Sequence, residues 1–296
     1  MSNSTPVLIF CYRRKISKLI ESLLKNKEAN QTELFIFSDG FKSNKDKKDV
    51  YEIREYLKRI NGFKLVNIFE SDVNKGLANS IIDGVTKVIN KYGEVIVLED
   101  DLIVSPYFLD FMNSALIFFK EKKNIWSISG YSPEIQELKT YKKEVYLSLR
   151  SSSWGWATWL DRWNKVDWQI NDFEVLKKNN LKIKSFEEGG NDLFKMLELQ
   201  YLGKIDSWAI RWCYSQFLSS TFSVTPKVSM VQNIGFGDGF GTHNSGDGSK
   251  WKVKLANSKI SDFEVTFDSE IVNFFKKYYD INSLTRLSYF LKKWIR

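Results

Sequence analysis

Short apolar runs alternate with helical repeats between residues 7 and 98. The apolar runs predict four strands, over 7–11, 34–37, 63–68 and 95–98. Apolar residues at intervals of three and four predict amphipathic helices between these strands, over 16–24, 50–60 and 77–88. Strands and helices that alternate in this way form a mostly parallel sheet with helices on both faces. The pattern therefore predicts an α/β fold whose ligands gather at the carboxyl ends of the strands.

Polar residues follow these strands directly. They are Tyr12, Arg13 and Arg14 after the first strand, Ser38, Asp39 and Gly40 after the second, and Glu99, Asp100 and Asp101 after the fourth. The regular alternation stops at Trp126, but no Pro- or Gly-rich linker marks a boundary there. We therefore expect one continuous fold whose second half is built differently from its first.

Composition narrows the chemistry that this fold can carry. The 296 residues are 43% hydrophobic, which is enough for a full core. The net charge is only +8, because 36 acidic residues offset most of the 44 basic ones, so we expect no nucleic-acid partner. Two cysteines, Cys11 and Cys213, give neither a disulfide framework nor a zinc motif, and they fit a reducing compartment. With His243 as the only histidine, carboxylates must supply most of the chemistry.

The three consecutive acids Glu99, Asp100 and Asp101 follow the apolar run 95–98 without a gap. Three carboxylates at the end of a buried strand repel one another unless a cation neutralises them. Oxygen ligands without a matching His or Cys favour Mg²⁺ or Mn²⁺, which commonly share their coordination with substrate phosphates. Alternatively, one of the acids caps the helix that begins near Ser105 and Pro106.

The segment 97–111, Val-Leu-Glu-Asp-Asp-Leu-Ile-Val-Ser-Pro-Tyr-Phe-Leu-Asp-Phe, resembles the Glu-Asp-Asp region of the N-acetylglucosaminyltransferase I family of GT-A glycosyltransferases. Further segments resemble this family in the same order, and together they cover about residues 6–243. They are 6–13, 37–40, 154–156, 206–208 and 236–237. The run 153–159, Ser-Trp-Gly-Trp-Ala-Thr-Trp, is similar to bacterial enzymes of surface-polysaccharide assembly.

The resemblance implies a GT-A fold, Rossmann-like and mostly parallel, and a division of the chain into three parts. These are a nucleotide-sugar-binding half at 1–125, an acceptor-side half at 126–250 and a C-terminal extension at 251–296. It also implies that Asp101 holds the metal on the diphosphate of a UDP-sugar donor. Glu99 and Asp100 would then face the donor sugar and ribose, with Tyr12 beside them, and Arg13 and Asp39 would hold the uridine.

Several of these residues also have ordinary interpretations. Asp39-Gly40 is a common turn and Arg13-Arg14 a common surface pair. Lys75 stands at the start of a helix, where it would contact the nucleotide or a phosphate. The alternative is that it only caps this helix and is solvated at the surface.

An inverting transfer also needs a base that takes the proton from the acceptor hydroxyl. Asp206, in Ile205-Asp206-Ser207-Trp208, matches the family's Trp-Asp-x-Trp pattern, in which the Asp is this base, although Ile205 replaces the first Trp. The alternative is that Asp206 caps the following helix. Three other acids remain as substitutes for the base, namely Asp161, Asp167 and Asp192.

Aromatic and glycine-rich segments complete the second half. Trp156, Trp159 and Trp163 are spaced for one face of a helix, and we expect most tryptophans here to be core, with Trp154 or Trp156 at the donor-sugar or acceptor pocket. Residues 235–248 contain six glycines and predict a loop. In the family such a loop closes over the donor, which would bring His243 to the diphosphate; an incidental surface loop is the alternative.

The tail 281–296 combines basic residues with leucines at helical spacing. Two interpretations stay open: a helix docked on the core, or a basic amphipathic helix on an anionic membrane. The sequence has no apolar run long enough for a membrane span and no secretory signal, so we expect a cytoplasmic protein. If the tail binds a membrane, we expect the protein at the inner face of the cell membrane.

The leading functional hypothesis is a metal-dependent, inverting glycosyltransferase that transfers a sugar to a glycan or lipid-linked acceptor. One alternative is a sugar nucleotidyltransferase, although its glycine-rich loop after the first strand is absent from 12–15. Another is a glycan- or membrane-binding module without turnover. The retained acidic triplet argues against the last of these.

Overall fold

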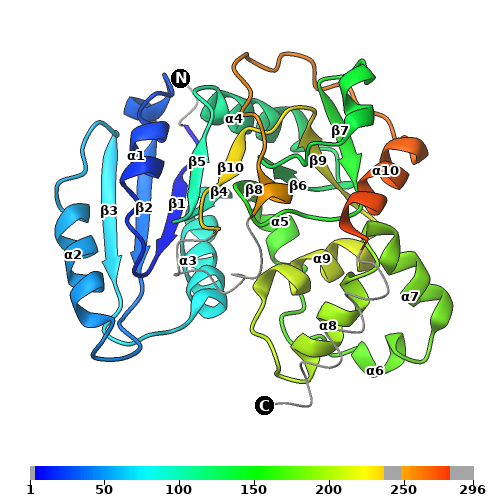
Figure 1. Ribbon diagram of the computed structural model, residues 1–296, viewed down its shortest axis with the longest axis horizontal. Helices are drawn as coiled ribbons and strands as arrows, with labels where there is room; N and C mark the ends of the chain where they lie inside the picture. The colour runs from blue at the N-terminus through cyan, green and yellow to red at the C-terminus, as the bar shows by residue number, and fades with distance from the viewer. Residues whose placement is uncertain (1–3, 237–247, 281–296) are drawn as a thin grey trace.

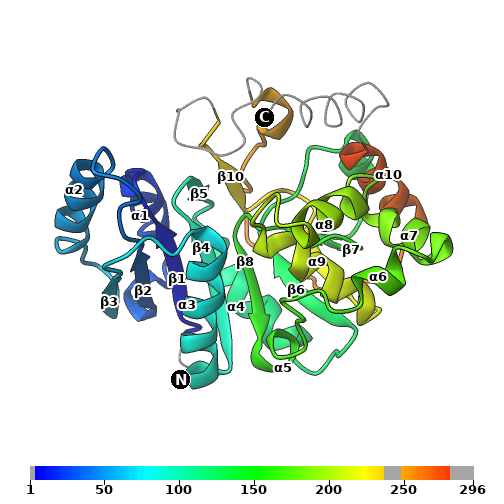
Figure 2. The same cartoon turned by 90° about the horizontal axis from the view of Figure 1, so that it is seen from below.

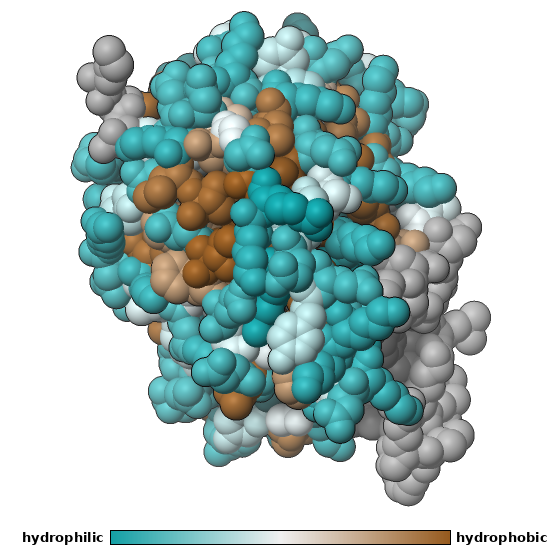
Figure 3. Space-filling view, turned by 90° about the vertical axis from the view of Figure 1, so that its left-hand side faces the viewer, coloured by the Kyte–Doolittle hydropathy of each residue, from teal (hydrophilic) through white to brown (hydrophobic). Residues whose placement is uncertain are grey.

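A sheet of eight strands organises the computed structural model, which describes residues 4–236 and 248–280 (Figure 1). The strand order is β3-β2-β1-β4-β8-β6-β9-β7. The strands are β1 (Val7–Cys11), β2 (Glu33–Ser38), β3 (Leu65–Glu70), β4 (Glu94–Glu99), β6 (Ile125–Ser129), β7 (Val145–Ser148), β8 (Trp156–Trp159) and β9 (Phe222–Pro226). The outer strand β3 has a neighbour on one side only, so Leu65 is 50% exposed, and apolar side chains gather on this side of the molecule (Figure 3).

Pairing directions divide the sheet into two parts. From β3 to β4 every pair is parallel, whereas β8 runs antiparallel to both β4 and β6, and β7 antiparallel to β9. A separate two-stranded ribbon pairs β5 (Leu102–Val104) with β10 (Val231–Asn233). The ribbon carries the chain from the second half back to the end of β4.

Helices cover both faces of the parallel part. The apolar sides of α1 (Ser17–Leu23), α2 (Lys47–Leu57) and α4 (Phe108–Phe119) share one core with alternate residues of β1 and β2. On the opposite face, α3 (Leu77–Tyr92) packs with five buried tryptophans. This arrangement follows from the right-handed crossovers of parallel strands and is visible from below (Figure 2).

A helical layer lies beyond the antiparallel strands (Figures 1 and 2). It contains α5 (Leu160–Trp163), α6 (Phe173–Leu176), α7 (Asn180–Phe186), α8 (Leu193–Tyr201), α9 (Trp208–Leu218) and α10 (Ser269–Tyr279). Single 3₁₀ turns occur at Ala29–Gln31, Gln136–Thr140, Glu187–Gly189 and Ser249–Trp251. None of the helices in the described ranges is long and apolar enough to cross a membrane.

The predicted α/β fold is confirmed, and the strand at 7–11 has the predicted bounds. Two details were wrong. Glu99 is the last residue of β4 rather than the first residue after it. Trp156 and Trp159 do not lie on a helix: they belong to β8, and their side chains enter the cores on opposite faces of the sheet. Antiparallel pairing of β8 with β4 overrides the helical spacing, because it buries both indoles.

Candidate active site

The carboxyl ends of β1 and β4 bring a basic and an acidic segment together. Arg14 donates from Nη1 to Asp100 Oδ1 at 2.7 Å, and the same nitrogen lies 3.4 Å from Asp101 Oδ2. The backbone N–H of Tyr12 donates to Asp100 Oδ2 at 3.2 Å. All three charged side chains are mostly buried, with 14–19% of their surface exposed. The Arg14 guanidinium thus faces the acidic turn of Asp100 and Asp101, which directly follows Glu99 at the end of β4.

The pKa values of Glu99 and Asp100 are both raised. Burial raises the pKa of Asp100 to about 6; the adjacent Asp101 adds to the rise, and Arg14 opposes it. Burial and the two neighbouring carboxylates also raise the pKa of Glu99 well above its ordinary value. Burial is the main cause of both shifts, and repulsion between neighbouring carboxylates adds to it.

The acidic turn does not cap the following helix. The N-cap position of α4 is Tyr107, whose N–H donates to Ser105 Oγ. The alternative that an acid of the turn caps this helix is therefore excluded. Instead Ile234 N–H donates to the carbonyl of Asp101 at 2.7 Å. A Cβ at Gly235 would lie 2.7 Å from Asp101 Oδ2 and 3.0 Å from Arg14 Nη2, so only glycine lets the chain pass this closely.

Asp39 joins the loops that follow β2 and β3. Its Oδ1 accepts from the N–H groups of Gly40 and Lys75, and its Oδ2 accepts from Gly76 N–H at 3.0 Å. Gly40 lies so close to Val73 that a Cβ there would be 2.4 Å from the Val73 carbonyl carbon. Asp39 and Gly40 do not form a turn: the Asp39 carboxylate instead holds the backbone of Lys75 and Gly76 beside the end of β2.

Arg54, on α2, also contacts the loops that follow β2 and β3. Its guanidinium donates to the carbonyl oxygens of Asp39 and Ser71, at 3.3 and 2.7 Å, and to Ser38 Oγ at 3.3 Å. The side chain is almost completely buried, and Nη1 lies 3.5 Å from Glu70. Arg54 thus holds the carboxyl ends of β2 and β3 in register.

The remaining donor-side candidates have partners of their own. Arg13 pairs with Asp46 and stacks on Tyr12, whose hydroxyl accepts from Lys42 N–H at 2.8 Å. The Lys75 ammonium lies on the surface of α3, 2.9 Å from Asp83. Lys75 therefore reaches the site through its backbone, by way of Asp39.

Asp206 stands opposite these loops. Its Oδ2 would lie 3.8 Å from a Cβ on Gly76, and its Oδ1 accepts from Arg211 Nη2 at 3.2 Å. The side chain is 58% exposed. It does not cap α9, because the N-cap is Ser207, whose hydroxyl accepts from Ile210 N–H. The structure therefore brings this acid to the same edge of the sheet as Asp39.

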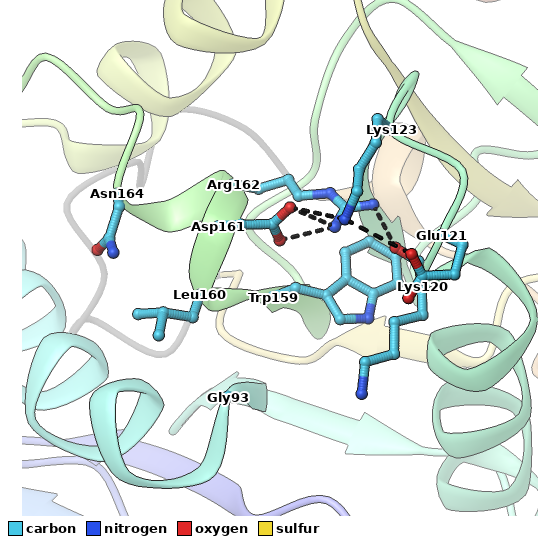
Figure 4. Close-up of a pocket in the computed structure, with 9 residues that line it drawn as sticks. All are labelled: Gly93, Lys120, Glu121, Lys123, Trp159, Leu160, Asp161, Arg162 and Asn164. Atoms are coloured by element: carbon cyan, nitrogen blue, oxygen red, sulfur yellow. Dashed lines mark hydrogen bonds and ion pairs between the residues drawn. The ribbon is translucent and has the colours of Figure 1, made fainter.

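The three substitute acids are occupied elsewhere. Asp192 forms a two-point ion pair with Arg150, and Asp167 accepts backbone and side-chain N–H groups of its own turn. Asp161 lines a pocket of about 350 Å³ at the opposite end of β4, where it pairs with Arg162 and Lys123 (Figure 4). These hydrogen bonds outweigh burial and hold the pKa of Asp161 below its ordinary value. Asp206 is thus the best placed of the four acids.

Trp154 and Trp156 have different surroundings. Trp156 is a core residue, stacked on Trp163 and Trp208. Trp154 is half-buried and contacts Phe236 and Trp251, next to the Gly235 that covers Asp101. His243 and the tail 281–296 lie outside the described residues, as does most of the glycine-rich segment.

The sequence analysis assigns no role to Arg14 or Arg54 in the candidate site. Arg14 follows β1 and so belongs to the polar residues expected at the carboxyl edge, and the structure excludes the alternative of a simple surface pair, because the side chain is 14% exposed and contacts Asp100. Arg54 stands within the apolar stripe of α2, between Val50, Ile53 and Leu57, and a charged residue in such a stripe signals a buried contact.

Acidic and basic groups thus meet at the carboxyl edge of the parallel sheet, beside the switch in strand order between β1 and β4, where open α/β folds bind their ligands. The sequence model of the GNT-I family matches residues 1–170, more than half of the chain, and the chain belongs to this family. It is a glycosyltransferase with a GT-A fold, which uses a nucleotide-sugar donor and a glycan acceptor. No curated protein matches the chain.

Proposed function

We propose that the protein is a metal-dependent, inverting glycosyltransferase with a UDP-sugar donor. The transferred group would be a hexose or an N-acetylhexosamine, and the acceptor a glycan or lipid-linked saccharide. The similarity of the run 153–159 to bacterial enzymes supports a role in the synthesis of a surface polysaccharide.

One observation carries the proposal: Asp100 and Asp101 share Arg14 directly after Glu99 at the end of β4, and the pKa values of Glu99 and Asp100 are raised. Oxygen ligands of this kind suit Mn²⁺ or Mg²⁺. Within the described ranges, no three acidic, His or Cys side chains are grouped to hold a metal on their own. Asp101 would therefore bind the ion together with phosphate oxygens of the donor, and the ion would stabilise the departing diphosphate as a Lewis acid.

The other residues have separate roles in this proposal. Asp39, fixed by three backbone N–H groups, would accept the imide N–H of uracil, and Arg13 would contact the nucleotide from the loop after β1. Glu99 and Asp100 would face the sugar and ribose. Asp206 would take the proton from the acceptor hydroxyl, a role that its exposed carboxylate allows.

Calorimetric titration with UDP and a panel of UDP-sugars tests the proposal, with Mn²⁺ and with a chelator. We expect metal-dependent binding to the wild type and its loss in Asp101→Asn. Asp161→Asn is the matched control, because it makes the same change at the other end of β4 and should leave binding unchanged. Binding that persists in Asp101→Asn or in the chelator would exclude the metal role, and no binding of any uridine nucleotide would exclude the donor class.

A further inference from the structure

Arg14 occupies the position at which the acidic turn would receive a cation. Its Nη1 is shared between Asp100 Oδ1 and Asp101 Oδ2, at 2.7 and 3.4 Å, and its Nη2 lies against Gly235. Only 14% of the side chain is exposed. Asp101 is the same carboxylate that the proposed metal site requires, so the guanidinium and a divalent cation would compete for one group of oxygens.

Arg14 also has room to move. It lines a groove of about 1,040 Å³ between α1 and α2, together with Arg13, Lys15 and Lys18. Arg13, by contrast, is held by Asp46, a residue outside the acidic turn. Rotation of the Arg14 side chain into this groove would separate the guanidinium from Asp101.

We infer that Arg14 is an exchangeable counter-cation of the acidic turn. Without a divalent ion it neutralises Asp100 and Asp101; when the metal and the nucleoside diphosphate bind, its guanidinium transfers from Asp101 to the diphosphate. A guanidinium suits this second role, since it donates to phosphate oxygens with several N–H groups. The inference rests on the proposed donor class and adds a second positive group on the leaving diphosphate.

The exchange predicts opposite effects of one substitution on two binding constants. In Arg14→Gln, Mn²⁺ alone should bind about tenfold more tightly, because a competing positive charge is gone. UDP in the presence of saturating Mn²⁺ should bind about tenfold more weakly, because a phosphate ligand is lost. Manganese binding is measured by electron paramagnetic resonance of the free ion, and UDP binding by calorimetry.

Two further variants keep the test decisive. Lys15→Gln removes the same charge from the same groove without a contact to the acidic turn, so both constants should stay within about twofold of the wild type. Arg14→Lys, which preserves the charge and the fold, should restore weak binding of Mn²⁺ alone. If Arg14→Gln weakens or strengthens both ligands together, or changes neither, the exchange is wrong. If the wild type binds neither Mn²⁺ nor UDP, the proposed function itself fails, and the inference fails with it.

Discussion

Carboxyl groups at the two ends of β4 have pKa values shifted in opposite directions. At the amino end, Asp161 is bonded by both Arg162 and Lys123, and its pKa is held low. At the carboxyl end, Asp100 and Asp101 share Arg14, and the pKa values of Glu99 and Asp100 are raised. The low pKa of Asp161 is that of a carboxylate stabilised by its ion pairs, whereas buried carboxyl groups with raised pKa values are typical of functional sites. The difference supports our proposal that the reaction takes place at the carboxyl end.

Replacing Asp101 should have the largest effect. Asp101→Ala removes the proposed metal ligand, and we expect turnover to fall by about 10⁴-fold, since a bound metal contributes several kcal/mol to charge stabilisation in the transition state. Initial rates of sugar transfer with Mn²⁺ measure this loss. Turnover close to that of the wild type would show that the two ends of β4 do not differ in function.

Asp206 tests the chemistry separately from donor binding. Asp206→Asn removes the proposed base but preserves shape, so transfer should fall by about 10³-fold while metal-dependent UDP affinity stays unchanged. Single-turnover rates and calorimetry on the same sample separate the two quantities. Unaltered transfer would remove Asp206 from the mechanism, whereas equal losses of binding and transfer would place it in the donor site.

The raised pKa of Asp100 should make the stability of the folded chain depend on pH. Because the folded chain holds the Asp100 proton more tightly than the unfolded chain, the free energy of unfolding without metal should fall as the pH rises from about 4 to about 6. A rise in pKa from 3.8 to about 6 corresponds to about 3 kcal/mol. Denaturant unfolding in a chelator measures the slope, and Asp100→Asn should reduce it; Glu99, whose pKa is also raised, accounts for part of the slope that remains. An equal slope in that variant would contradict the assignment.

The amino end gives the smallest predicted effect. Asp161→Ala leaves the buried Arg162 without its carboxylate, and we expect a loss of about 1 to 2 kcal/mol. The loss is moderate because Asp161 is 45% exposed and Arg162 keeps three backbone carbonyl acceptors. Thermal and denaturant unfolding check this value, and sugar transfer should be unchanged. Reduced transfer in a fully folded variant would show that this pocket also serves the reaction.

The first half of the fold was predictable because its signals are local. The alternation of 7–11, 34–37 and 95–98 with helical repeats marks a parallel sheet, and three acids after an apolar run mark its carboxyl edge. The region around Trp156 was not predictable in the same way. Its spacing fits a helix, yet pairing with β4, some sixty residues earlier, makes it a strand.

The sequence by itself determined the fold class, the family resemblance and the acidic and basic residues that follow the strands at the carboxyl edge of the sheet. Only the tertiary structure decided which basic side chain each of these carboxylates contacts. Asp192 is neutralised by Arg150, and Asp101 shares Arg14 with Asp100, through contacts between residues 42 and about ninety positions apart. Such pairings depend on how distant loops meet, which no local pattern encodes. The approach of Asp206 to Gly76 has the same origin: it exists because α9 packs against α3.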